Sequence, residues 1–201
     1  MSFYEAFNYR RVSGFRENQL YTSARQVHAE WREHKKVAIL ENEIGEFSVD
    51  DKILKGAGYK AQTMFSGCIC CTISGSLPIN INAIEEDIHP DWIIIESTGV
   101  AYPDSIKLNI KESLNYDSRI CCIADAKRWH RLLKPMEVLL SSQLSDADVI
   151  LINKADAVEE KELESIVESV CGYSHLAAVI PISADQGIDT AVFDIVTGEE
   201  E

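Results

Sequence analysis

The pattern that specifies the fold is clearest in Asp148-Val149-Ile150-Leu151-Ile152-Asn153-Lys154-Ala155-Asp156, an apolar run that stops at a polar loop. The apolar residues are continuous and do not alternate with polar ones, which is typical of a strand covered on both faces of a sheet. Further runs of this kind lie at 36–40, 91–95, 119–123 and 177–180. Their repetition predicts a mostly parallel sheet.

Segments between these runs carry apolar residues at helical spacing, as in Leu77, Ile81, Ile84 and Ile88. Similar stripes lie at 20–31, 129–140 and 163–170. Alternating strands and helices predict an α/β chain with a three-layer α/β/α, doubly wound fold. Ligands of such folds bind at the carboxyl ends of the strands.

Composition narrows the classes of partner. The net charge of -14 repels nucleic-acid phosphate and anionic lipid, so neither nucleic acid nor membrane is an expected partner. No apolar run follows the first residues, and no segment approaches the roughly 20 apolar residues of a membrane span. A cytoplasmic location is therefore expected. In that reducing compartment, six cysteines favour metal or thiol chemistry over disulfides.

A polar loop, Asn153-Lys154-Ala155-Asp156, follows the strand expected at 148–152. Here a lysine stem could lie against a purine while a carboxylate accepts the two N–H donors of guanine's edge, which adenine lacks. The next expected strand leads into Ser183-Ala184, where a backbone N–H could meet the base carbonyl. The two loops resemble the guanine-specificity elements of GTPases, with plain polar surface loops as the alternative. The candidate nucleotide-binding residues are Asn153, Lys154, Asp156, Ser183 and Ala184.

Three cysteines lie within four residues in Gly67-Cys68-Ile69-Cys70-Cys71. Their thiolates are soft ligands that suit zinc or a related divalent metal such as cobalt or nickel. In an extended loop Cys68 and Cys70 share a face and Cys71 points away, so binding by all three needs a turn. The alternative is that they are small core residues. A structural role is expected for the remaining cysteines: Cys121, Cys122 and Cys171.

Carboxylates gather at the ends of two expected strands. Glu41-Asn42-Glu43-Ile44-Gly45-Glu46 follows the first, and crowding its three carboxylates is costly unless a cation neutralises them. An acidic surface turn is the alternative. The strand at 91–95 runs into Glu96-Ser97-Thr98-Gly99, where nucleotide hydrolases hold a magnesium-organising acid. Glu96 is the candidate for that acid, with a strand-terminating turn as the alternative.

In this order the motifs resemble those of CobW-type GTPases, relatives of the HypB and UreG metal-insertion GTPases. The resemblance extends over about residues 11–184, and Cys-x-Cys-Cys is its most specific element. It implies a P-loop NTPase fold, with one G domain over 1–201. Members of the family usually carry a further carboxy-terminal domain, and none is expected within these residues. It also implies that guanine-nucleotide state is coupled to binding and delivery of zinc, cobalt or a related metal.

The resemblance assigns roles to individual residues. It implies that Cys68, Cys70 and Cys71 are metal ligands or gatekeepers and that Glu41 and Glu46 bind metal. In addition, Asp125 matches a strand-end aspartate of the family. A metal-receiving client protein is the implied partner, and a homodimer is compatible with the family. GTP or GDP with magnesium is a further candidate ligand.

The phosphate-binding loop departs from the family's Gly-x-x-x-x-Gly-Lys-Ser/Thr pattern. Val12-Ser13-Gly14-Phe15 matches its start, but Gln19 stands at the second glycine, Leu20 at the lysine and Tyr21 at the magnesium-binding hydroxyl. A side chain at position 19 obstructs the close backbone approach to phosphate, and Leu20 removes a charged donor. Losing two or three charged hydrogen bonds of about 1.5–3 kcal/mol each weakens triphosphate binding by about two to five decades.

Three functions are compatible with these features. The favoured one is a metal-binding, guanine-nucleotide-binding metal chaperone or metallocentre-assembly accessory in which GTP hydrolysis is impaired or lost. A second is an active GTPase metallochaperone in which Arg16, Arg25 or a shifted Thr22 repairs the phosphate loop. The third is a scaffold or interaction protein that binds neither ligand.

Overall fold

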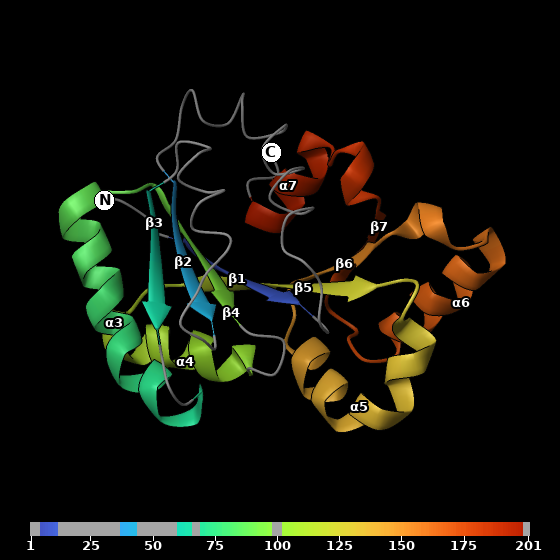
Figure 1. Ribbon diagram of the computed structural model, residues 1–201, viewed down its shortest axis with the longest axis horizontal. Helices are drawn as coiled ribbons and strands as arrows, with labels where there is room; N and C mark the ends of the chain where they lie inside the picture. The colour runs from blue at the N-terminus through green and yellow to red at the C-terminus, as the bar shows by residue number, and fades with distance from the viewer. Residues whose placement is uncertain (1–4, 12–36, 44–59, 66–68, 98–101, 199–201) are drawn as a thin grey trace.

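The computed structural model describes residues 5–11, 37–43, 60–65, 69–97 and 102–198. Within these ranges the strands form one sheet in the order β3-β2-β4-β1-β5-β6-β7 (Figure 1), and every neighbouring pair is parallel. The strands are β1 (Glu5–Arg11), β2 (Val37–Glu43), β3 (Lys60–Phe65), β4 (Trp92–Ser97), β5 (Ser118–Asp125), β6 (Val149–Asn153) and β7 (Ala178–Ile182). The helices are α3 (Ile69–Ile88), α4 (Pro103–Leu114), α5 (Trp129–Ser145), α6 (Glu160–Cys171) and α7 (Thr190–Thr197), with short 3-10 turns η1 (Ala155–Ala157) and η2 (Ala184–Gln186).

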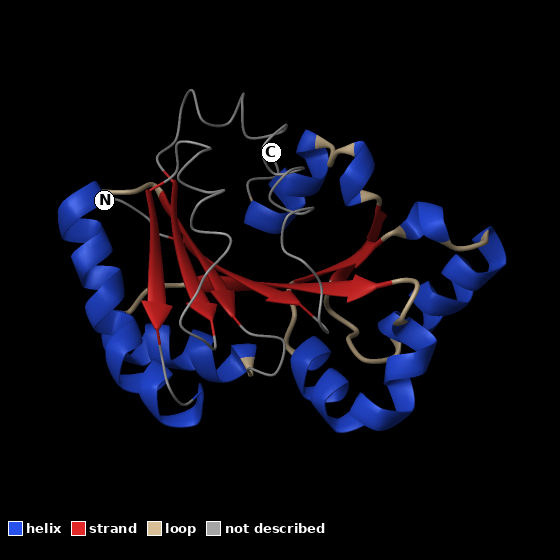
Figure 2. Ribbon diagram, viewed as in Figure 1, coloured by secondary structure: helices blue, strands red, loops and turns tan. Residues whose placement is uncertain are grey.

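Helices cover both faces of the sheet (Figure 2), which confirms the predicted three-layer α/β fold. On one face α3 and α4 pack on Leu40, Ile93 and Ile95. On the same face α5 and α6 pack on alternate side chains of β5 and β6, such as Ile120 and Ile150. On the other face Phe193 and Val196 of α7 close a second core. Both faces of β5 and β6 are therefore buried, which explains their continuous apolar sequences.

Five of the strands were predicted from apolar runs, and two others were not. β3 lies at the edge of the sheet, and its sequence Lys-Ala-Gln-Thr-Met-Phe is only partly apolar. β1 has the sequence Glu-Ala-Phe-Asn-Tyr-Arg-Arg and yet occupies the centre, paired with β4 and β5. Its pairing with β4 and β5, and not an apolar run, identifies it as a central strand.

Two helices also lie outside the predicted set. α4 has clear local signals: Pro103 in its first turn, Asp104 beside it, and Asn115 as a left-handed C-cap. α7 lies after Ala184, in a stretch for which no helix was predicted. It is a docked helix with buried apolar residues.

The topology fixes where a ligand can bind. The chain leaves β1, forms β2, β3 and β4 on one side of it, and then crosses to β5 on the other side. The carboxyl ends on both sides of β1 therefore flank the topological switch point, where ligands of doubly wound folds bind. Among the helices described, none is long and apolar enough to cross a membrane.

Candidate functional site

Asn153 joins the two loops predicted to bind guanine. It ends β6 and is buried, and its register partner on β7 is Ile182. Its Oδ1 accepts the N–H of Lys154 at 2.8 Å and the N–H of Ala184 at 3.0 Å. One side-chain oxygen thus fixes the start of both loops. Because the N–H of Ala184 already donates to Asn153, a backbone N–H that binds a base carbonyl has to come from another residue of the loop.

Lys154 adopts the left-handed backbone conformation, with φ 65° and ψ 36°. Its Nζ donates to Oδ2 of Asp125, the last residue of β5, at 2.9 Å. The two side chains are 16% and 8% exposed, so this ion pair is largely withdrawn from water. The contact of Asp125 with this loop was not predicted, although its place at the end of a strand was the available signal.

Asp156 presents an exposed carboxylate between the two loops. Its N–H donates to Oγ of Ser183 at 3.2 Å, and its Oδ2 accepts Nε2 of Gln186 at 3.3 Å. The sequence analysis did not single out Gln186. Because these polar contacts join Asp156 to the next loop, its carboxylate is held at the surface where the two loops meet.

Two of the predicted metal-binding residues, Cys68 and Glu46, lie outside the described residues. Glu41 lies on β2 and pairs in register with Glu96 of β4 and with Thr63 of β3. The backbone of Cys70 and Cys71 lies in the first turn of α3, which starts at Ile69. The backbone is therefore helical from residue 69 onward, and this helix is a turn of the kind that binding by all three thiols needs.

The neighbouring strands β2 and β3 bring these metal motifs to one corner of the sheet. The acidic motif begins near the carboxyl end of β2, and the cysteine motif follows the carboxyl end of β3. The phosphate loop, including Gln19, Leu20 and Tyr21, falls outside the described residues. Among the side chains that are described, no group of three metal-ligating residues occurs.

The other cysteines have ordinary structural surroundings. Cys121 and Cys122 are buried in β5, as predicted, and Sγ of Cys122 donates to the carbonyl of Gln143 at 3.1 Å. Burial, with a smaller contribution from Cys122, raises the pKa of the Cys121 thiol far above its usual value. A thiol held neutral in this way is a poor metal ligand. Cys171 lies at the end of α6 and is exposed.

Comparison with known families gives the assignment. The sequence model of the CobW/HypB/UreG nucleotide-binding domain matches residues 24–181. The chain belongs to this family. The match runs from before β2 to within β7, so it includes the cysteine motif and the Asn153–Asp156 loop that was predicted to bind guanine.

Individual members of the CobW/HypB/UreG family are similar at moderate identity. The zinc chaperone CobW of a Sinorhizobium species is 28% identical over 170 residues, covering 68% of this chain and 48% of the relative. The hydrogenase maturation factor HypB of Archaeoglobus fulgidus has a similar fold, with a TM-score of 0.66, 13% identity, and coverage of 97% of this chain and 89% of HypB. The Zn(II)-bound YjiA GTPase of Escherichia coli superposes with a TM-score of 0.63 and 20% identity, covering 100% of this chain and 63% of YjiA. The chain spans about half the length of the curated relatives it matches, for example 48% and 45%.

Proposed function

We propose that this CobW-family chain binds a guanine nucleotide and a zinc-class metal ion, passes the metal to a client protein, and hydrolyses GTP poorly. The observation that carries the proposal is the assembled base site: Asn153 joins the two loops, and Asp156 presents its carboxylate between them. An exposed carboxylate in a fixed loop suits guanine, whose edge offers two N–H donors, and leaves adenine without a partner.

The order of strands supports a link between nucleotide and metal. The base loops follow β6 and β7, the phosphate loop follows β1, and the metal motifs follow β2 and β3. Four strand spacings separate β2 from β6, about 19 Å at roughly 4.8 Å each. A nucleotide with its base at β6 and β7 would extend its phosphates toward β1 and β4, next to the metal corner. Glu96, near the carboxyl end of β4, is the acid that we propose organises magnesium.

The metal proposal rests on donor chemistry and on the names of relatives. Cys68, Cys70 and Cys71 are soft donors, and Glu41 and Glu46 add carboxylates near the same corner. CobW is named a zinc chaperone, and YjiA was crystallised with Zn(II). Zinc is here the cargo, with cobalt and nickel as chemically similar alternatives.

The test of the metal proposal is the double variant Cys70→Ser/Cys71→Ser. Reduced unmodified protein should bind about one zinc ion, and loss of two thiolates should lower the affinity by orders of magnitude. Cys171→Ser is the matched control, because it removes one exposed thiol from the end of α6. Competition against a chromophoric zinc chelator measures both. Equal affinity in the double variant and the control would refute the thiolate site.

The test of impaired hydrolysis is steady-state phosphate release. Phosphoryl transfer depends on loop backbone, lysine and magnesium, so Gln19, Leu20 and Tyr21 predict turnover near background with or without zinc. The triple variant Gln19→Gly/Leu20→Lys/Tyr21→Thr should bind GTP more tightly. Robust magnesium-dependent hydrolysis by the unmodified chain would instead support the active GTPase alternative.

A further inference from the structure

The Asp125–Lys154 pair, at the carboxyl ends of β5 and β6, combines three features that are energetically unfavourable. The ion pair is largely buried, and such pairs often contribute little to stability because both charges lose hydration. Oδ1 of Asp125 is buried without a hydrogen-bond partner among the described residues. Lys154 is held in a left-handed conformation that is unfavourable for a residue with a side chain. Features of this kind gather at functional sites.

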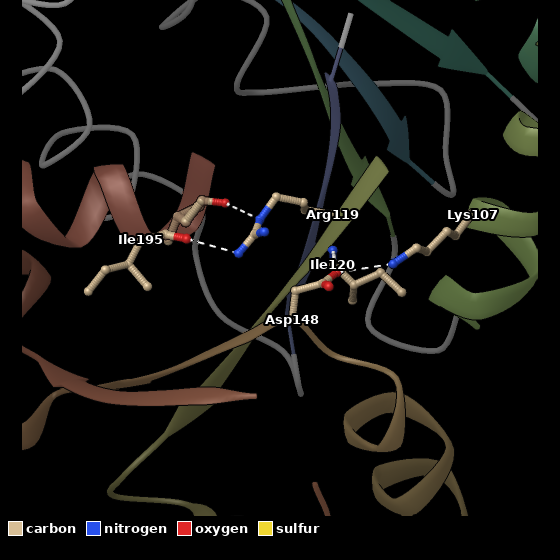
Figure 3. Close-up of polar contacts among 6 residues, drawn as sticks. Lys107, Arg119, Ile120, Asp148 and Ile195 are labelled. Atoms are coloured by element: carbon tan, nitrogen blue, oxygen red, sulfur yellow. Dashed lines mark hydrogen bonds and ion pairs between the residues drawn. The ribbon is translucent and has the colours of Figure 1, made fainter. Parts of the chain in front are cut away.

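A second aspartate–lysine pair provides a comparison. Asp148 directly precedes β6, at the amino ends of the strands. Its Oδ2 accepts a hydrogen bond from Nζ of Lys107 at 3.2 Å and from the N–H of Ile120 at 2.7 Å (Figure 3). The Lys107 and Asp148 side chains are 39% and 30% exposed. That pair is more hydrated and joins α4 to β5 and β6, as expected for a structural contact. The Asp125–Lys154 pair instead joins the end of β5 to the loop after β6, and it is the more deeply buried of the two pairs.

We propose that Asp125 is a positioning residue for guanine recognition and acts through Lys154. Asp125 holds the lysine ammonium at the end of β5, and Asn153 holds the lysine backbone, so both ends of the side chain are fixed. The methylene stem between them then forms a preorganised apolar surface for the face of a purine. A lysine fixed in advance loses no rotamer freedom when the base binds. This inference rests on the proposed guanine site and deepens it.

The proposal predicts strong coupling between the two residues. Asp125→Asn keeps the shape but removes the charge, and Lys154→Met keeps the stem but removes the ammonium. Each should weaken GDP binding about tenfold, by releasing the stem from its fixed position. The double variant Asp125→Asn/Lys154→Met should bind GDP no more weakly than either single variant, because both changes remove one interaction.

The experiment is a double-mutant cycle with GDP and ADP as probes, measured by calorimetry or ligand-observed NMR, alongside urea unfolding. Asp148→Asn is the matched control, expected to lower stability and leave the GDP affinity unchanged. The double variant has no unpaired buried charge, so it tests the idea even if Asp125→Asn folds poorly. Unchanged GDP affinity in Asp125→Asn, or a loss of about a hundredfold in the double variant, overturns the inference.

These outcomes separate the inference from the function on which it rests. If the unmodified chain binds GDP no better than ADP, the guanine site itself is refuted and the positioning role falls with it. If the unmodified chain prefers GDP and the two residues are uncoupled, the guanine site stands and only the role of Asp125 is lost.

Discussion

Asn153 accepts two backbone N–H groups with one side-chain oxygen, and this connects residues that are 31 positions apart in the sequence. Asp156 depends on that connection, since its own N–H donates to Ser183 in the second loop. At the scale of single residues, the proposed base recognition is therefore shared. Asn153 joins the loops, Lys154 is fixed beside them, and Asp156 presents the carboxylate that we propose discriminates between bases.

Asp156→Ala should remove the preference for guanine. A hydrogen bond to a charged group is worth about 1.5–3 kcal/mol, so GDP affinity should fall by about one to two decades while ADP affinity changes little. Titration calorimetry with both nucleotides measures the ratio. Asp185→Ala removes an exposed charge from the neighbouring turn η2 and is the control, expected to retain the ratio. A GDP preference that survives in Asp156→Ala would contradict the assignment of this carboxylate.

At the scale of elements, α7 is joined to the sheet at its carboxyl end. Arg119 of β5 donates from Nε to the carbonyl of Val196 at 3.2 Å and from Nη2 to that of Ile195 at 3.1 Å. These carbonyls belong to the last turn of the helix, where a cation is favourable. Gly198 follows as a left-handed cap whose N–H donates to the carbonyl of Asp194. One arginine therefore positions the helix that closes the second core.

Gly198→Ala should lower the free energy of unfolding by about 1–2 kcal/mol, because an L-residue in the left-handed conformation is strained. Its φ is 73°, and a Cβ there would approach Nη1 of Arg119 to 2.9 Å. Urea unfolding measures the loss. Gly172→Ala is the control, since Gly172 caps α6 with a right-handed φ of -66° and should cost less. An equal or greater cost at Gly172 would show that the cap of α7 is not special.

At the scale of the molecule, β5 lies between two apolar cores. Cys121 faces the core closed by α7, and Cys122 faces the core under α5 and α6. The Cys121 thiol is fully enclosed, and its raised pKa means that it stays protonated in the folded chain at alkaline pH. In the unfolded chain the same thiol ionises near its ordinary pKa of about 8.5. The contribution of this neutral thiol to the free energy of unfolding is thus fully present below about pH 8.5, and it falls as the pH rises further.

Comparing Cys121→Ala with the parent tests this linkage. The difference in unfolding free energy between parent and variant should shrink above about pH 8.5, by up to about 1.4 kcal/mol per pH unit. Urea unfolding at several alkaline pH values gives that difference. Cys171→Ala is the matched control, because the exposed Cys171 thiol meets water in both states. A difference for Cys121→Ala that stays constant with pH would rule out a buried neutral thiol.

The amino-acid sequence by itself determined the layers of the fold and the positions of five strands, each of which ends one to three residues beyond its apolar run. Continuous apolar runs such as 149–152 indicate burial on both faces, and helical stripes such as Leu77, Ile81 and Ile84 indicate which sides face the sheet. The proximity of the loops after β6 and β7 was also predictable, since consecutive strands that are neighbours bring their carboxyl ends together. Signals for α4 were present in Pro103 and Asp104 and were overlooked.

The tertiary structure alone decided the central place of β1, the docking of α7 and the pairing of Asp125 with Lys154. β1 has few apolar residues, so only its hydrogen bonding to β4 and β5 reveals that it is central. α7 packs on strands far from it in sequence, and Asp125 meets a lysine 29 residues later. These contacts depend on which strands become neighbours. The packing of the whole chain selects those neighbours, because a local sequence pattern does not identify the partners of a strand in the sheet.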